Sequence, residues 1–161
     1  MAPLIYVVVP VTGLKKSCSR AIAFLVCDGS PDVDGITAFE HLSEAKEREL
    51  RTRFDYWIEH QRQDKYFHGW PNEPSNKHCF VFKWKEKNVN QRLYGFKFNP
   101  KPKTSPGFQV CILVSHGTKG EWETDPGHKT LANLMRSKQA VIDAIKIAFP
   151  DVEEGDKSCM N

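Results

Sequence analysis

The chain has 161 residues, of which 40% are hydrophobic and 27% are charged, and its formal net charge is +3. This length and composition suit one globular domain with its own hydrophobic core, and they exclude a largely disordered or repetitive protein. The cysteines form no CxxC pair and are odd in number, so we expect reduced thiols and neither a disulfide framework nor a zinc site. They are Cys18, Cys27, Cys79, Cys111 and Cys159.

The first eleven residues are apolar, but no basic residue precedes them and they are too short to span a bilayer. We therefore expect a short buried strand or an N-terminal extension there, in a cytoplasmic protein without membrane contact. The last residues are polar and charged, which is typical of a fraying end. The predicted organisation is a single domain over residues 1–161, with an extension over 1–18, a core over about 19–150 and a flexible tail over 151–161.

Residues 21–27 form a continuous β-type run that ends in turn-forming residues. A helical period follows and predicts two helices, over residues 36–42 and 44–60. Thr37 and Glu40 have the spacing of a capping box, and Ser43 can cap the second helix. The predicted inward side chains are Phe39, Leu42, Leu50, Phe54, Trp57 and Ile58.

Residues 61–78 contain Gly69, Pro71, Pro74 and several polar residues and are predicted to be a long connection. From Cys79 the period is two, which predicts a hairpin of strands 79–85 and 91–98 around a turn at residues 87–90. A proline-rich loop over 99–107 leads to a nearly apolar strand over 108–116, which we expect at the centre of the sheet. A closing helix follows, with an inward stripe formed by Leu131, Leu134, Met135, Ile142 and Ile145.

Together these elements predict an α+β fold, in which the helices of residues 36–60 pack against one face of a mainly antiparallel sheet. The predicted strands are residues 21–27, 79–85, 91–98 and 108–116, and a C-terminal helix completes the domain.

Positive charge is concentrated in the predicted hairpin and the loop after it. Residues 83–103 contain seven Lys or Arg residues and one acid, Glu86, so this span carries +6 while the whole chain carries +3. A cationic sheet on an otherwise mildly acidic protein favours a phosphate-rich partner, most simply RNA. The alternative is a solvated strand face, since lysine is common on exposed edges. The chain has no P-loop, GxGxxG, HExxH or GxSxG motif and no cluster of metal ligands, so we expect no cofactor and no metal.

Three stretches resemble the RelE/HigB superfamily of toxins, in particular its phage-derived HigB-like branch. Residues 38–50 (AFEHLSEAKEREL) are similar to the family's helical hairpin. Residues 80–85 (FVFKWK) and 91–96 (QRLYGF) are similar to its strand pair. Residues 114–119 (VSHGTK), with Pro126 beyond them, resemble a hydrophobic strand that ends in a loop bearing His and Lys. The likeness covers roughly residues 21–149 and is one of order more than of letters.

The resemblance implies a RelE-like fold and a toxin of a type II toxin–antitoxin pair. Such toxins are small ribonucleases, most of which cut messenger RNA on the ribosome, and each is silenced by an antitoxin that is often a helix-turn-helix protein. RelE-like members usually carry an Arg and a Tyr near the C-terminus, where this chain has Asp151, Glu153 and Glu154. This departure favours the HigB-type arrangement, with His116 and neighbouring lysines.

RNA cleavage without a metal needs a base for the 2′-hydroxyl proton, an acid for the leaving 5′-oxygen and cations that stabilise the transition state. His116 suits proton transfer, and Arg92 suits bidentate phosphate binding. The predicted catalytic residues are His116, Arg92, Lys85 and Lys119. The predicted RNA-binding residues are Lys83, Lys87, Tyr94, Lys101 and Lys103.

Each of these roles has a structural alternative. His116 can be a hydrogen-bonded histidine at a strand end, Arg92 can pair with an acid of the helical hairpin, and Tyr94 can belong to the core together with Trp84. We expect the remaining histidines at the surface; they are His41, His60, His68, His78 and His128. The alternative function is a non-enzymatic RelE-fold protein that binds RNA or a protein partner through its basic sheet.

Overall fold

The structure is a computed structural model that describes residues 4–118 and 124–151. Its elements, in chain order, are β1 (Tyr6–Pro10), β2 (Arg20–Cys27), α1 (Gly35–Glu40), α2 (Glu44–Ile58), β3 (Phe67–Gly69), a short 3-10 helix η1 (Pro74–Asn76), β4 (Cys79–Glu86), β5 (Val89–Phe98), β6 (Gln109–Thr118), α3 (Thr124–Ser137) and α4 (Gln139–Ala148). The predicted α+β class is confirmed.

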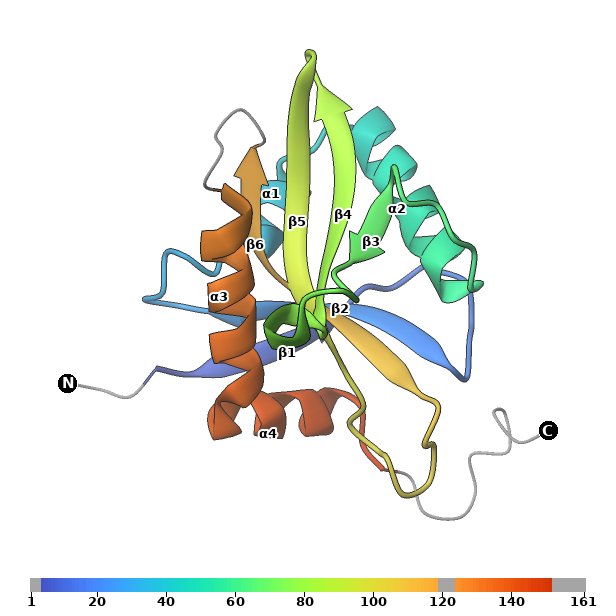
Figure 1. Cartoon of the computed structure of the whole chain (residues 1–161), viewed down its shortest axis with the longest axis vertical. Helices are drawn as coiled ribbons and strands as arrows, with labels where there is room; N and C mark the ends of the chain where they lie inside the picture. Colours follow the sequence, from blue (N-terminus) through green and yellow to red (C-terminus); the bar gives the residue numbers. More distant parts are fainter. Residues whose placement is uncertain (1–3, 119–123, 152–161) are drawn as a thin grey trace.

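The strands form one mixed sheet with the order β1-β2-β6-β5-β4-β3 (Figure 1). The pairing of β2 with β6 is parallel, whereas the other four pairings are antiparallel. The predicted hairpin of residues 79–85 and 91–98 is confirmed, because β4 and β5 pair from Cys79 with Phe96 to Glu86 with Val89. The apolar strand β6 lies between β2 and β5, which confirms its predicted central place.

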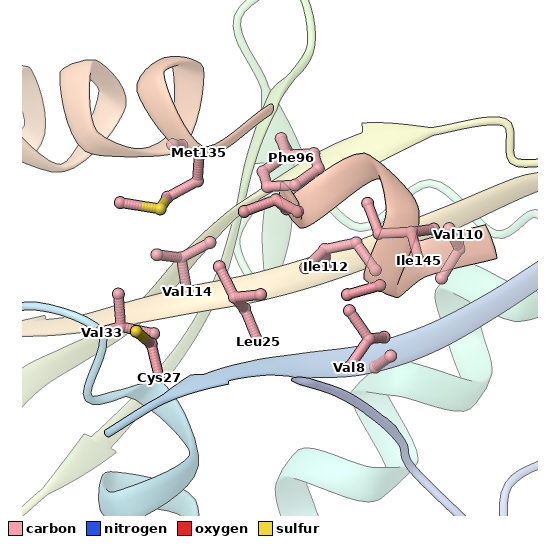
Figure 2. Packing of buried hydrophobic residues seen from close by; sticks show 14 of the residues in the cluster. Val8, Leu25, Cys27, Val33, Phe96, Val110, Ile112, Val114, Met135 and Ile145 are labelled. Carbon is pink, nitrogen blue, oxygen red and sulfur yellow. The ribbon is translucent and has the colours of Figure 1, made fainter. Parts of the chain in front are cut away.

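Helices cover both faces of the sheet, and each face has its own core. On one face, α1 and α2 bury aromatic side chains against the sheet. The rings of Phe54 and Phe82 meet edge to face there, with their centroids 4.8 Å apart. On the other face, α3 and α4 contribute Met135 and Ile145 to a largely aliphatic cluster (Figure 2). The period of two in β5 follows from this arrangement, because Leu93 faces α2 and Phe96 faces α4.

Helix α2 matches the sequence closely. Ser43 caps it by accepting a hydrogen bond from the Lys46 amide at 3.2 Å. The predicted inward residues from Leu50 to Ile58 are buried, and so is Phe39 of α1. The capping box at Thr37 is wrong, because α1 begins earlier, after Asp34.

Two other predictions need correction, and a third is confirmed in one of its alternatives. The closing helix is two helices, because Lys138 adopts an extended conformation between α3 and α4. Leu134, which was predicted to face inward, is half exposed. The connection over 61–78 contains the edge strand β3. Residues 6–10 form β1 at the opposite edge, where Val8 is buried against α4, so of the two alternatives for the N-terminal residues the short strand is confirmed.

The cysteines are also more varied than expected. Cys27, Cys79 and Cys111 are buried free thiols, whereas Cys18 is disulfide-bonded, so the prediction of reduced thiols is wrong for that residue. No helix in the described ranges 4–118 and 124–151 is long and apolar enough to cross a bilayer.

A β-bulge interrupts the pairing of β5 with β6. Tyr94 pairs with Ser115, but the next residue, Gly95, pairs with Leu113, so Val114 is an extra residue on β6. The strands approach so closely there that a Cβ atom on Gly95 would lie 2.0 Å from the carbonyl oxygen of Ile112. Because side chains alternate along a strand, the extra residue exchanges the faces on which the later side chains of β6 lie.

Candidate functional site

Four strands bring polar and aromatic residues into one row on the face that α3 covers. The register places His68 of β3 beside Val81, Val81 beside Tyr94, and Tyr94 beside Ser115 of β6. In the neighbouring row, Lys83 of β4 lies directly opposite Arg92 of β5. Residues that pair directly share a face, so these two cations lie next to the Tyr94 row.

Arg92 is held by the first turn of α3. Its side chain is only 7% exposed, and its Nη1 atom lies 3.1 Å from both carboxylate oxygens of Asp125. The Tyr94 hydroxyl donates a hydrogen bond to the same carboxylate. Burial and this hydrogen bond raise the pKa of Tyr94, so its hydroxyl stays protonated as a donor. The Arg92 Nε atom is buried and has no hydrogen-bond partner in the described residues.

Stacked rings support this cluster. The imidazole of His128, on α3, lies parallel to the Tyr94 ring with centroids 4.3 Å apart, and its Nδ1 atom is 2.6 Å from the Ser115 hydroxyl. The ring of Trp70 stacks with that of Tyr94 at a centroid distance of 6.5 Å. The ring of His68 meets that of Trp70 edge to face, with centroids 5.0 Å apart. Burial lowers the pKa of His128. His128 was predicted to be a surface residue, and that prediction is wrong.

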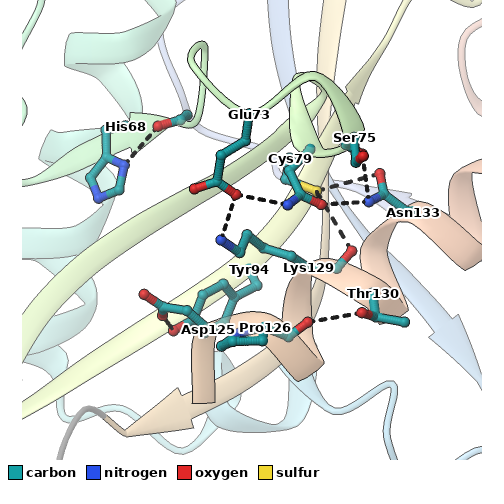
Figure 3. Close-up of polar contacts among 12 residues, drawn as sticks. His68, Glu73, Ser75, Cys79, Tyr94, Asp125, Pro126, Lys129, Thr130 and Asn133 are labelled. Atoms are coloured by element: carbon teal, nitrogen blue, oxygen red, sulfur yellow. Dashed lines mark hydrogen bonds and ion pairs between the residues drawn. The ribbon is translucent and has the colours of Figure 1, made fainter. Parts of the chain in front are cut away.

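The segment that carries Trp70 is fixed to α3 by a polar network (Figure 3). Lys129 binds the Glu73 carboxylate at 2.9 Å and also lies 4.8 Å from the centre of the Trp70 ring. Asn133 donates to the side chain of Asn76 at 2.8 Å. Burial raises the pKa of the Cys79 thiol to about 11, so this thiol stays protonated beside the Lys129 carbonyl oxygen. The network holds the residues before β4 in one place against α3.

A hollow of about 440 Å³ opens beside Arg92 and Lys83, and we name it the cationic groove. Five of its lining residues are cations and one is a carboxylate, Glu49, which is itself paired with Arg53 at 2.8 Å and Lys46 at 3.2 Å. Tyr66 adds an aromatic ring, 4.1 Å from the Arg53 guanidinium. The cations are Arg53, Lys65, Lys83, Lys85 and Arg92. Such a groove suits a ligand with more than one negative charge.

The structure brings together three of the predicted site residues, Lys83, Lys85 and Arg92. Lys87 is exposed in the tight turn between β4 and β5. Lys101 and Lys103 lie in the loop after β5, at the end of that strand away from the groove (Figure 1). Tyr94 is buried and bonded to Asp125, so base stacking does not fit its environment.

Lys119, the remaining predicted catalytic lysine, lies outside the described residues. The ion pair of Arg92 was anticipated with an acid of the helical hairpin, and that assignment is wrong, because the partner is Asp125 of α3. Trp84 is buried as expected, but against α2, on the face opposite Tyr94.

His116 lies on the face opposite Arg92. It pairs with Leu93, its Nε2 atom is 2.6 Å from the Gln91 side-chain oxygen, and its amide donates to Asp34 at 2.8 Å. The hollow beside it, about 290 Å³, is lined by the carboxylates of Asp34 and Glu86 and by no Lys or Arg among the described residues. The structure therefore does not bring the two principal predicted catalytic residues together, and the surroundings of His116 disfavour a phosphate.

The cluster formed by Arg92, Tyr94, Asp125 and His128 was hard to predict from the sequence. Asp125 and His128 have the i, i+3 spacing that places two residues on one face of a helix, and this was the one local signal. Their contacts with β5 and β6 depend on how α3 packs on the sheet.

No protein-family model, curated protein or solved structure matches the chain.

Proposed function

We propose that this protein binds RNA through the cationic groove and cleaves it without a metal, as a ribonuclease toxin of a toxin–antitoxin pair. One observation carries the RNA-binding part. Five cations line the cationic groove, and its one carboxylate, Glu49, is already paired with Arg53 and Lys46. A phosphate in the groove would form charge-assisted hydrogen bonds with these cations, and such bonds are roughly twice as strong as those between neutral groups.

The charge distribution supports a polymeric anion over a small one. The groove carries five cations against one carboxylate, and Lys87 continues the positive charge onto the exposed hairpin turn. Successive phosphates of one strand can occupy such a track. The resemblance to RelE/HigB toxins adds the expectation of messenger RNA on the ribosome as substrate, and of an antitoxin as partner.

A second function, binding without cleavage, is favoured by a specific observation. None of the ten residues that line the cationic groove is a histidine, so the groove itself offers no group that exchanges a proton near neutral pH. The two functions differ only in whether a bound RNA is cut.

The decisive experiment measures binding of a fluorescein-labelled single-stranded RNA by anisotropy over a series of salt concentrations. We expect Lys85→Gln to weaken binding and to reduce the slope of log K against log salt by about 0.7, as expected for one lost phosphate contact. Lys103→Gln, which removes the same charge at the far end of β5, is the matched control. Equal effects of the two substitutions, or an affinity that does not change with salt, would contradict the proposed groove.

Cleavage is tested separately with ribosome-bound messenger RNA and with the same RNA free in solution, both with an excess of chelator. We expect cut products in at least one of the two reactions. Tight, salt-dependent binding without any cut product supports the binding-only function.

A further inference from the structure

We propose that His68 is the general base of this RNA cleavage and accepts the 2′-hydroxyl proton on its Nε2 atom. This inference rests on the proposed function and adds the catalytic group that the lining of the cationic groove lacks. It differs from the assignment to His116, which the sequence favoured.

The tautomer of His68 is set by its neighbour. Nδ1 lies 2.9 Å from the backbone carbonyl oxygen of Gly69 (Figure 3). A carbonyl oxygen only accepts hydrogen bonds, so Nδ1 carries the proton and Nε2 keeps its lone pair. The edge-to-face contact with Trp70 restrains the ring further, and Trp70 is itself held by Lys129. His68 is therefore a half-buried imidazole with its basic nitrogen defined in advance.

His68 is also close to the cations that would hold a phosphate. It lies on the α3 face, in the row next to the pair formed by Lys83 and Arg92. A second hollow, about 700 Å³ in volume, is lined by both His68 and Lys83, and Lys83 also lines the cationic groove. An RNA strand that follows Lys83 from one hollow to the other therefore passes His68.

The charged groups around His68 favour its neutral form. The positive charges of Lys83 on β4 and Arg92 on β5 disfavour the protonated form of His68, whereas the negative charge of Asp125 on α3 favours it. Burial is the largest effect and lowers the pKa of His68, the two cations lower it further, and the Gly69 carbonyl and Asp125 oppose them. A neutral imidazole near pH 7 is the form that accepts a proton.

Other histidines in the described ranges fit this role less well. His116 is on the opposite face beside Asp34 and Glu86. His128 is stacked on Tyr94 and bonded to Ser115, and the Nε2 atom of His60 is engaged by Ser19 at 2.8 Å.

The proposed step is a transesterification. The Nε2 atom of His68 takes the 2′-hydroxyl proton while the 2′-oxygen bonds to phosphorus. The bond between phosphorus and the 5′-oxygen breaks, and the leaving oxygen takes a proton from water. The products are a 2′,3′-cyclic phosphate and a 5′-hydroxyl, and no oxidant, reductant or metal is required. Lys83 and Arg92 stabilise the additional negative charge at the phosphate.

The test compares His68→Ala with His41→Ala, which removes an exposed histidine from the end of α1. We expect His68→Ala to reduce the single-turnover cleavage rate by about a hundredfold, the usual scale for a lost acid–base group, and added imidazole to restore at least part of it. Binding of a 2′-O-methyl RNA, which cannot be cut, should change less than twofold. The low-pH decline in the rate should be present in the parent protein and absent in His68→Ala.

The outcomes separate the two proposals. If His68→Ala cleaves at the parent rate, or if its loss is not rescued by imidazole, the role of His68 is overturned while the proposed function stands. If the parent protein binds 2′-O-methyl RNA but cuts neither free nor ribosome-bound RNA, cleavage and the role of His68 are both overturned and RNA binding stands. His68→Gln provides a second variant if His68→Ala does not fold, and the urea midpoint of each variant reports folding.

Discussion

Arg92 and His116 project from opposite faces of the sheet, although they lie on adjacent strands and the neighbour of Arg92, Leu93, pairs directly with His116. The bulge at Val114 produces this arrangement. Before the bulge, Val110 and Ile112 face α3 and α4; after it, Ser115 occupies that face and His116 turns to the other. One extra residue in β6 thus separates two side chains that a regular strand would have placed on the same face.

We therefore expect His116→Ala to leave RNA affinity and cleavage within about twofold of the parent values. Its side chain contacts Gln91 and Trp84, which both line the cationic groove, but His116 itself is not a lining residue of the groove and lies beside Asp34 and Glu86 in the smaller hollow. The same anisotropy and cleavage assays check this expectation, with Lys85→Gln as the variant that should respond. A large loss of cleavage in a folded His116→Ala protein would contradict this expectation and would support a catalytic role for His116.

The pair formed by Arg92 and Asp125 should contribute to stability as well as to ligand binding. We expect Arg92→Ala to lower the free energy of unfolding by about 2 to 4 kcal/mol, because it leaves the Asp125 carboxylate without its cation and empties a buried site. A double-mutant cycle with Asp125→Asn, followed by urea denaturation, measures the coupling of the two residues. The exposed pair of Arg62 and Asp64 is the control. Its Arg62→Ala variant should change stability by at most about 0.5 kcal/mol.

Gly95 should tolerate no side chain. A methyl group there would meet the Ile112 carbonyl oxygen at 2.0 Å, and backbone atoms of two paired strands cannot yield as a flexible side chain does. We expect Gly95→Ala to cost about 2 kcal/mol or more in urea denaturation. Gly107→Ala is the matched control, because a Cβ atom on Gly107 would meet nothing within 4 Å. Equal midpoints for the two variants would mean that β5 and β6 are less closely packed than described.

A substitution in the turn between β4 and β5 should increase the stability of the protein. Lys87 and Asn88 both have positive φ, 48° and 66°, as in the two-residue turns that favour Asn followed by Gly. Asn88→Gly should raise the free energy of unfolding by a few tenths to about 1 kcal/mol, because glycine adopts this conformation without steric cost. Thermal denaturation can detect the change. A loss of stability in Asn88→Gly would show that the Asn88 side chain contributes more than its backbone conformation.

Stability should fall on acidification. Burial lowers the pKa of His128 in the folded protein below its ordinary value of about 6.5. The unfolded chain then binds more protons as the pH falls through about 6.5, so unfolding becomes more favourable. His68 and His116 act in the same direction. We expect the urea midpoint to decrease from pH 7.5 to pH 5 and to decrease less in His128→Gln. His41→Gln is the control and should behave like the parent protein.

Local patterns in the sequence were sufficient for much of the fold. Alternation identified β4 and β5, and the helical period with Ser43 as cap identified α2, because each signal depends on residues close in the chain. These local patterns were insufficient where a single residue or a single tertiary contact determines the structure. Three residues of β3 are too few to show a period, and alternation alone cannot reveal the extra residue at Val114.

The candidate site was predicted only in part for the same reason. The run of lysines on β4 was visible, and it led to Lys83 and Lys85 in the groove. Asp125 and His128 join Arg92 and Tyr94 across more than thirty positions of sequence, and Trp70 comes from a connection without any regular pattern. Such contacts are set by the packing of α3 on the sheet.

The parallel pairing of β2 with β6 bears on how the chain reaches this structure during synthesis. Arg20 must meet Gln109, and Phe24 must meet Leu113, before the centre of the sheet is closed. Closing such a long loop costs chain entropy that few earlier contacts can offset. The apolar strand β2 must therefore wait, with one edge unpaired, until most of the chain has left the ribosome, and we expect assistance from a chaperone to raise the yield of folded protein.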